Sequence, residues 1–199
     1  EHDRVSSKSA RNIRVDGGEV SLDVELGYPA KSQFEPIRKL VIGALRQVQG
    51  VENVSVQVSM KIVAHAVQRG VHLMPNVKNI IAVASGKGGV GKSTTAVNLA
   101  LALAAEGANV GILDADIYGP SQPRLLGVEG VRPQAREKVL LPVETRFGVP
   151  MLSMGGLVAE GQAIAWRGPM AGGALGQLVD ADWGDAELLV LDLPPGTGD

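Results

Sequence analysis

The first 60 residues alternate between strand-like and helix-like patterns of apolar side chains. Val20 to Leu26 places an apolar residue at every second position, which predicts a half-buried strand. Residues 12–15 precede it across a Gly-Gly turn and predict its hairpin partner. Apolar positions then recur at helical spacing over residues 34–48, and Gly50 is expected to end this helix. Residues 54–58 alternate again, so the pattern predicts a small α+β unit of strand, strand, helix and strand.

The later part of the chain has the pattern of a parallel α/β sheet. Short, nearly continuous apolar runs occupy Ile80–Ala84, Val110–Leu113 and Leu188–Leu191, which predicts strands covered on both faces. Lys92–Ala105 predicts a helix that is apolar almost all round, and Met170–Val179 predicts a second helix rich in small residues.

The remaining segments give weaker predictions. Pro120–Pro133 is punctuated by proline and glycine and predicts a long loop, whereas residues 139–143 and 149–152 predict two more strands. Gly70 and Pro75 mark a connection between two domains. We therefore expect an α/β fold with a largely parallel sheet, preceded by a small α+β domain. The expected division is a small domain at 1–70, a linker at 71–78 and the larger domain at 79–199.

Composition narrows the class of protein. Apolar residues make up 45% and charged residues 20% of the 199 residues, with a net charge of −2, so nothing suggests nucleic acid or an anionic membrane as a partner. The apolar run Leu99–Ala105 is too short to span a bilayer, and a cytoplasmic protein is expected. Cysteine is absent, and His2, His65 and His72 lack metal-ligand spacing, so a zinc site is not expected.

A phosphate-binding loop is the strongest motif. Gly86–Ser93 matches G-x-x-x-x-G-K-[ST] between a predicted strand and a predicted helix. Glycines let the backbone approach phosphate oxygens, and the amides at the helix start attract the anion. Lys92 is expected to reach the β- and γ-phosphates of ATP, and the Ser93 hydroxyl to bind Mg²⁺. The nucleotide-binding residues are predicted to be Gly86, Lys87, Gly88, Gly89, Val90, Gly91, Lys92, Ser93 and Thr94.

Carboxylates follow two of the predicted strands. Asp192 ends the apolar run 188–191 in the Walker B pattern, which predicts a Mg²⁺ ligand, direct or through water. Asp114 and Asp116 close the strand that begins at Val110 and lie at the sheet edge where water or metal is expected. Helix capping or simple solvation is the alternative role of Asp114.

Several motifs together resemble one family of ATPases. With Lys87 the loop reads K-G-G-x-G-K-S, which resembles the deviant Walker A signature of the nitrogenase iron protein, the division and DNA-partitioning ATPases and the Mrp/ApbC carriers. The runs DADIYGPSQ (114–122), WRGPM (166–170) and DLPPGTGD (192–199) resemble the Mrp/ApbC carriers in particular. The N-terminal unit resembles the iron–sulfur assembly domain that precedes the ATPase in many of them.

This resemblance implies a P-loop ATPase whose hydrolysis drives transfer of iron–sulfur clusters to apoproteins. It implies a homodimer in which Lys87 reaches the partner's nucleotide, Lys92 binds the phosphates and Asp116 orients the attacking water. It also implies that residues 194–199 form switch II.

The resemblance places the cluster ligands elsewhere. The family's Cys-x-x-Cys lies beyond switch II, so we expect this chain to be cut short at its C-terminus and to contribute no ligand to the cluster, expected to be 4Fe-4S in the full-length protein. Two alternatives stay open: an ATPase that positions division machinery or DNA, and a nucleotide-binding fragment without catalysis. Trp166 and Arg167 are as compatible with packing as with function.

Overall fold

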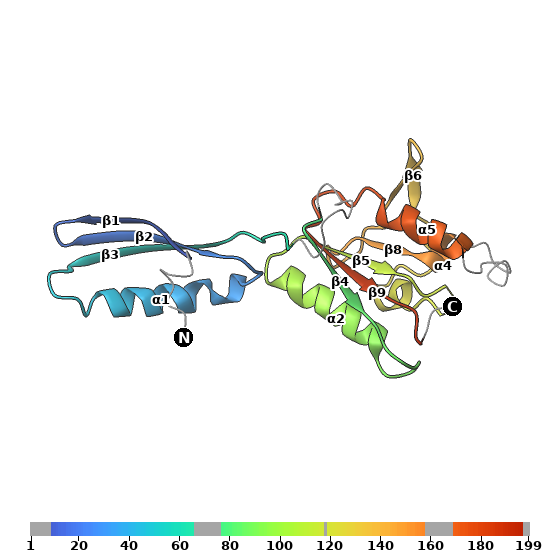
Figure 1. Cartoon of the computed structure of the whole chain (residues 1–199), viewed down its shortest axis with the longest axis horizontal. Helices are drawn as coiled ribbons and strands as arrows, with labels where there is room; N and C mark the ends of the chain where they lie inside the picture. The colour runs from blue at the N-terminus through green and yellow to red at the C-terminus, as the bar shows by residue number, and fades with distance from the viewer. Residues whose placement is uncertain (1–8, 66–76, 118, 158–168, 197–199) are drawn as a thin grey trace. The chain divides into compact units, whose positions relative to one another are not determined.

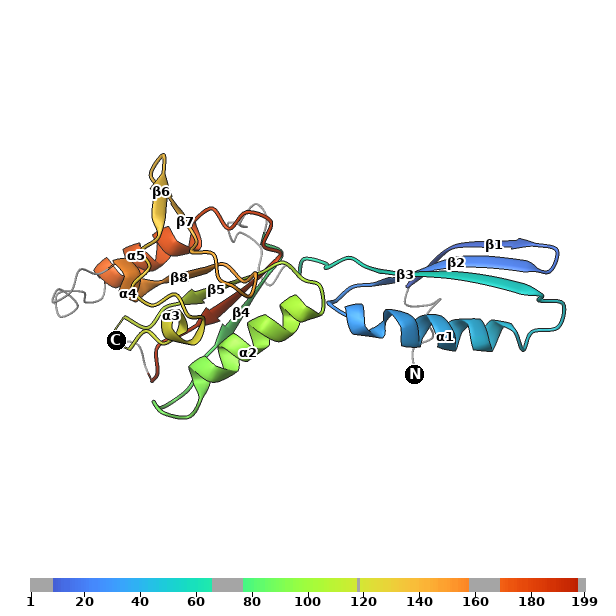
Figure 2. The ribbon, with the colours of Figure 1, turned by 180° about the vertical axis from the view of Figure 1, so that it is seen from behind.

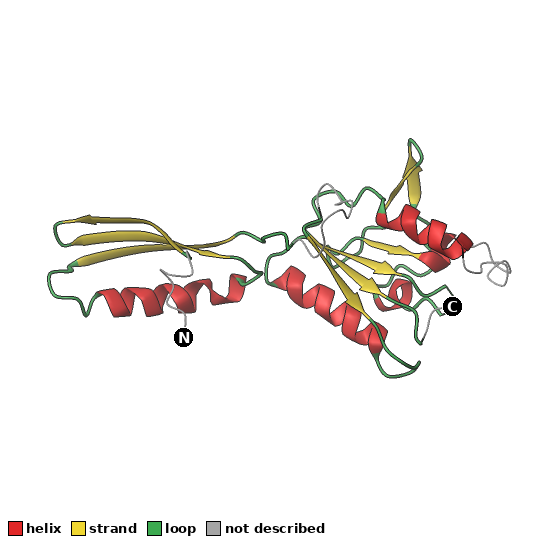
Figure 3. Cartoon of the chain, in the orientation of Figure 1, coloured by secondary structure: helices red, strands yellow, loops and turns green. Residues whose placement is uncertain are grey.

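A computed structural model describes residues 9–65, 77–117, 119–157 and 169–196, and the chain divides into two compact units, Glu1–Val63 and Ala64–Asp199 (Figure 1). The elements of the first unit are β1 (Ala10–Asp16), β2 (Glu19–Leu26), a 3-10 turn (Lys31–Gln33), α1 (Phe34–Leu45) and β3 (Asn53–Met60). Those of the second are β4 (Asn79–Val83), α2 (Lys92–Ala105), β5 (Val110–Asp114), α3 (Gln122–Leu125), β6 (Gln134–Arg136), β7 (Val139–Leu141), β8 (Met151–Ser153), α4 (Met154–Leu157), α5 (Pro169–Val179) and β9 (Leu188–Asp192) (Figure 3).

The first unit is a three-stranded sheet with α1 along one face (Figure 2). The strand order is β1-β2-β3, with β1 antiparallel and β3 parallel to β2. Val24 and Leu26 of β2 pack with Val56 and Val58 of β3 and with Ile37 of α1, which buries the apolar side of each alternating strand. The predicted sequence of strand, strand, helix and strand is confirmed.

Helix α1 ends earlier than predicted, at Leu45. After Leu45 the backbone hydrogen bonds change from the α-helical to the 3-10 pattern, as the Val48 amide donates to the Leu45 carbonyl. The Val48 side chain, expected on the apolar face of the helix, is 55% exposed. Gly50, at φ +89°, lies in the turn that follows instead of capping the helix. The chain reverses here because β3 must begin beside β2, where the Asn53 amide donates to the Gly18 carbonyl.

The second unit is built on a parallel sheet in the order β4-β9-β5-β8. Helix α2 contacts β4, β5 and β9 on one face. Leu178 of α5 packs with Leu113 and Leu189 in the core on the other face, so the central strands β5 and β9 are covered twice (Figures 1 and 2). The predicted α/β fold with a largely parallel sheet is confirmed.

Three segments of this unit differ from the prediction. Strand β4 is an edge strand of the described sheet, and Ile80 is 49% exposed, so this run is not covered on both faces. Its alternate side chains Ile81 and Val83 are half-buried, so the strand has one more protected face although its apolar run is continuous. The loop predicted at 120–133 contains α3. The strands predicted at 139–143 and 149–152 are present as β7 and β8, whereas β6, the hairpin partner of β7, was not predicted.

The expected linker at 71–78 lies mostly outside the described residues. Val77 is buried in the core of the second unit, and the Lys78 amide donates to the Glu187 carbonyl, so both residues pack with that unit. Within the described ranges, no helix combines the length and hydropathy that a membrane span requires.

Gly111 on β5 provides a test of the core. A Cβ at this position would lie 2.6 Å from Trp183 Cε3 and 3.2 Å from Leu189 Cδ1. The Trp183 ring cannot move away easily, because its Nε1 donates to the Leu178 and Val179 carbonyls. Gly111→Ala should therefore lower the free energy of unfolding by about 1–3 kcal/mol, measured by urea denaturation.

The matched control is Gly173→Ala in α5, where an added Cβ meets no atom within 4 Å. This exposed helical glycine should gain about 0.5–1 kcal/mol on substitution. Equal effects of the two substitutions would contradict the packing described for β5.

Candidate functional site

The glycine-rich loop links the end of β4 to the start of α2 and leaves open space around its backbone. Gly89 and Gly91 have φ of +76° and +88°, a conformation that side chains rarely adopt. A Cβ built on Gly86, Gly88, Gly89 or Gly91 meets no atom within 4 Å. Because α2 begins at Lys92, its first amides border this open space, which suits an anion.

A buried ion pair joins this loop to the central strand. Lys92 Nζ pairs with Asp192 Oδ1 at the end of β9, and their side chains are 7% and 0% exposed. The same ammonium lies 3.3 Å from Ser93 Oγ. The structure thus brings together the predicted phosphate lysine and both predicted Mg²⁺ ligands, although 100 residues separate Lys92 from Asp192 in the sequence.

Asp114, fully buried at the end of β5, organises the segment that follows it. Its Oδ1 accepts from the Asp116 amide at 3.0 Å. Its Oδ2 accepts from the amides of Ser121 and Gln122 at 2.8 and 2.9 Å. The carboxylate therefore holds Asp116 and the start of α3 at the end of β5, and its bonds to the first amides of α3 correspond to the capping alternative for Asp114.

Asp116 lies in this same folded segment and is half-buried. Its Oδ1 accepts from the Gly119 amide at 3.0 Å. The contacts of Asp114 hold its backbone above the strand ends, on the side of the sheet where Lys92 and Asp192 meet. Its predicted role with the attacking water stays a prediction.

Gln122 is a site residue that sequence reasoning missed. It is fully buried, and its Nε2 donates to the Ser93 carbonyl at 3.0 Å and to Asp192 Oδ2 at 2.8 Å. The available signal was the Ser121-Gln122-Pro123 run, since serine at an N-cap followed by proline in the first turn is typical of a helix start. That start would have placed Gln122 on α3.

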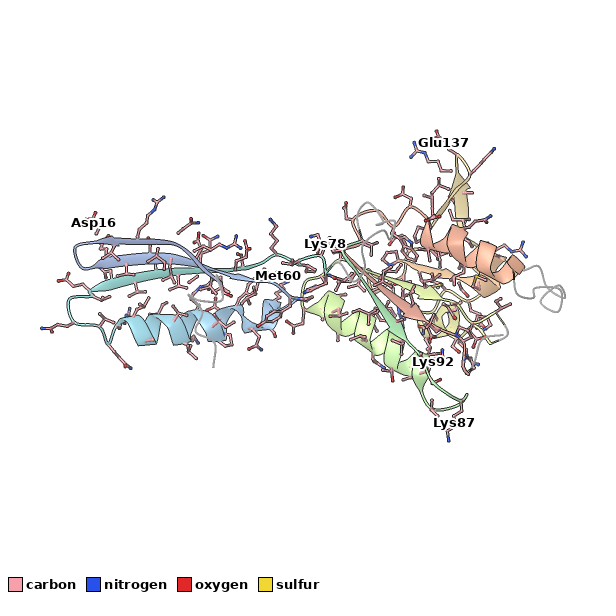
Figure 4. The ribbon with its side chains drawn as sticks, viewed as in Figure 1. Asp16, Met60, Lys78, Lys87, Lys92 and Glu137 are labelled. Atoms are coloured by element: carbon pink, nitrogen blue, oxygen red, sulfur yellow. The ribbon has the colours of Figure 1, made fainter. Side chains whose placement is uncertain are left out.

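Lys87 is not brought to the buried ion pair. Figure 4 shows it at the tip of the loop, directed away from the sheet, whereas Lys92 lies at the strand ends. The Ser85 hydroxyl donates to the Lys87 carbonyl at 3.0 Å and fixes the backbone there. Lys87 is thus presented at the surface, and Thr94 and Val90 are also exposed.

The expected switch II segment approaches the loop through one backbone bond. The Gly196 amide donates to the Ser85 carbonyl at 2.9 Å, directly before the first glycine of the motif. Residues 197–199, Trp166 and Arg167 lie outside the described residues.

These residues fit a nucleotide with Mg²⁺. The open glycine backbone leaves room for phosphates, and the donor set of a hydroxyl and a carboxylate suits a hard cation. Gln122 Oε1 is buried without a hydrogen-bond partner, as expected for an atom that a ligand completes. No group of three or more His, Cys, Asp or Glu residues in the described part could hold a metal, but Mg²⁺ on a nucleotide needs only one or two protein ligands.

Burial raises the pKa of Asp114 from 3.8 to about 6, against the backbone amides that lower it and with a smaller contribution from the charge of Asp192. The folded carboxyl therefore holds its proton more tightly than the unfolded one, and its contribution to stability falls as pH rises from about 4 to about 6.

Asp114→Asn should remove this pH-dependent contribution to stability. Without nucleotide, the stability of the parent relative to the variant should fall by about 2–3 kcal/mol between pH 4 and 7, measured by urea unfolding. A difference that stays constant or grows over this range would contradict it.

Comparison with known protein families covers both units. A family model described as NUBPL iron-transfer P-loop NTPase matches residues 76–199. A second model, described as iron-sulfur cluster assembly protein, matches residues 2–58.

Curated relatives carry the name iron-sulfur cluster carrier protein. The one from Pseudomonas fragi is 54% identical over 78% of this chain and 55% of its own length. That from Escherichia coli K12 is 48% identical over 90% of this chain and 49% of its own length. The chain thus spans about half the length of the curated relatives it matches.

A solved structure from Archaeoglobus fulgidus, described as a nucleotide-binding protein in complex with ADP, with Co found by PIXE, is also similar. It is 43% identical, covers 61% of this chain and 46% of its own, and superposes with a TM-score of 0.50. The sequence motifs, the parallel sheet with its phosphate loop and these matches agree: the chain belongs to the iron-transfer P-loop NTPase family, with an iron–sulfur cluster assembly domain ahead of the NTPase domain.

Proposed function

We propose that the whole protein is an ATPase that carries iron–sulfur clusters and delivers them to apoproteins, with ATP hydrolysis coupled to delivery. The observation that carries this proposal is the buried pair of Lys92 and Asp192 beside an open glycine loop, in a chain of the iron-transfer family. The names of the relatives support the cargo, and the loop supports the nucleotide. The cytoplasm is the proposed location.

Three residues hold the nucleotide and its cation. Lys92 leaves Asp192 and neutralises charge on the β- and γ-phosphates, while the first amides of α2 donate to phosphate oxygens. Ser93 Oγ and Asp192 would hold Mg²⁺, which when bound would draw electron density from the phosphates and lower the barrier to cleavage. In the ion pair, Asp192 takes the place of a phosphate beside Lys92, and Lys92 takes the place of the cation beside Asp192.

Hydrolysis needs two more groups in this proposal. Asp116 orients the attacking water beside the strand ends. Lys87, presented at the surface by the loop, supplies its charge to the nucleotide of a second subunit, so the working form is a homodimer with two nucleotides facing each other. A cation added at that point stabilises the charge that develops during phosphoryl transfer, as an arginine finger does.

The cluster is cargo, and its ligands are not among these residues. No cysteine occurs in the 199 residues, and carboxylates or imidazoles are poor substitutes for thiolates toward iron–sulfur clusters. We propose that cysteine thiolates in the remainder of the whole protein hold the cluster, of the 4Fe-4S type. The described NTPase unit then provides the nucleotide-dependent change that releases it.

The two loop lysines give a matched pair of variants in the whole protein. Lys92→Met should weaken ATP binding roughly 100-fold, because the loop loses its charge on the phosphates. Lys87→Met should bind ATP within about 3-fold of the parent but lose hydrolysis by roughly 100-fold. Titration calorimetry and phosphate release measure the two effects. Unfolding curves accompany them, since Lys92→Met leaves Asp192 buried without its partner, at about 3–5 kcal/mol.

A mixture of subunits separates the action of Lys87 in trans from action in its own subunit. Lys87→Met and Asp116→Ala proteins, each inactive, form hybrid dimers in which one site retains both groups. Partial return of hydrolysis is expected. Inactive mixtures, with hybrid dimers proven by mass spectrometry, would overturn the role of Lys87 across the dimer.

Cluster binding is tested by anaerobic reconstitution with iron and sulfide. The whole protein should turn brown and pass its cluster to an apo-acceptor, at a rate that ATP changes. The 199-residue chain alone should stay colourless, because it offers no thiolate. A colourless whole protein would refute the carrier function, and a stable cluster on this chain alone would refute the placement of its ligands.

A further inference from the structure

Gln122 has an atom that the described contacts leave incomplete. The residue is 0% exposed and lies in the first turn of α3. Among the described residues, its Oε1 is the buried side-chain polar atom without a hydrogen-bond partner. Buried polar groups are nearly always paired, so such an atom requires an explanation.

The orientation of the Gln122 amide follows from its neighbours. Nε2 donates to the Ser93 carbonyl at 3.0 Å and to Asp192 Oδ2 at 2.8 Å. Both partners are acceptors only, so the nitrogen must face them and the oxygen must be the unpaired end. Oxygen and nitrogen share one carbon atom, so the two contacts of Nε2 also fix the position of Oε1.

The surroundings fix this amide in place. Asp114 Oδ2 accepts from the backbone amides of both Ser121 and Gln122, which anchors the start of α3 to the end of β5. The side chain then reaches the start of α2 and the end of β9. One glutamine thus joins four elements around the Lys92–Asp192 pair.

An acceptor left unpaired in the interior destabilises the fold, a cost that a methionine of similar length would avoid. A glutamine at this position is explained if a ligand of the nucleotide-bound state donates a hydrogen bond to Oε1. Ser93 and Asp192 are the proposed Mg²⁺ ligands, and Mg²⁺ keeps several waters when it binds. A metal-bound water has its lone pair on the metal and offers only O–H donors to its surroundings.

We propose that Gln122 Oε1 accepts a hydrogen bond from a water of hydrated Mg²⁺, which makes Gln122 a positioning residue for the cation. The inference rests on the proposed nucleotide site. Its Nε2 holds Asp192 Oδ2 and so directs Oδ1, the oxygen that pairs with Lys92, toward the cation, while its Oε1 holds a water of that cation. Outer ligands of this kind typically change metal affinity 10–100-fold when removed.

Two substitutions in the whole protein test the role, with ADP affinity measured calorimetrically in EDTA and over a Mg²⁺ series. Gln122→Met removes both polar ends at similar length. Its ADP affinity in EDTA should stay within about 3-fold of that of the parent. The Mg²⁺ concentration that gives half of the magnesium-dependent change in ADP affinity should rise roughly 10-fold. Gln122→Glu keeps an acceptor but exchanges the Nε2 donor for a negative charge beside Asp192, which a cation neutralises, so its half-saturating Mg²⁺ should equal or fall below that of the parent.

The difference in magnesium requirement between the two variants distinguishes positioning from packing. If Gln122 only held α3 in place, both variants would weaken ADP binding in EDTA and with Mg²⁺ alike, and that result overturns the proposal. Should Gln122→Met fail to fold, Gln122→Glu decides, since a raised magnesium requirement there also overturns it. Gln134→Met, on the exposed strand β6, is the control and should change neither quantity. A parent that binds no ADP under any condition would refute the nucleotide site itself, a separate result.

Discussion

The buried ion pair between Lys92 and Asp192 is the interaction on which the rest of the site depends. Two charges with side-chain exposures of 7% and 0% are stable together, whereas either alone would be strongly unfavourable. The pair therefore fixes the start of α2 against the end of β9. It also keeps a cation and an anion in place for a ligand that carries both charges.

The parallel sheet explains why these groups meet. Strands β5 and β9 are neighbours, and Asp114 and Asp192 are paired in register at their carboxyl ends. Segments that leave this edge converge above it, and Asp114 folds its own segment back so that Gln122 reaches Asp192. The glycine loop, the end of β9 and α3 thus form one connected polar cluster at the carboxyl ends of the strands.

Local chemistry made much of this predictable from sequence. The motif at 86–93 predicts a phosphate-binding loop, and the apolar run ending at Asp192 predicts a Mg²⁺ ligand, from local sequence alone. The Gln122 link was not predictable, because it joins positions 70 residues apart through a helix of four residues. The exposed edge at Ile80 and the early end of α1 depend likewise on which elements pack nearby, and the apolar pattern alone does not carry that information.

The most direct measurement is a crystal structure of the whole protein with Mg²⁺ and a non-hydrolysable ATP analogue. Exchange of the ion pair is the predicted result, with Lys92 Nζ on phosphate oxygens and Asp192 facing the cation. The analogue should lie on the glycine backbone of residues 86–91. A bound analogue elsewhere, with the pair of Lys92 and Asp192 intact, would contradict the proposed site.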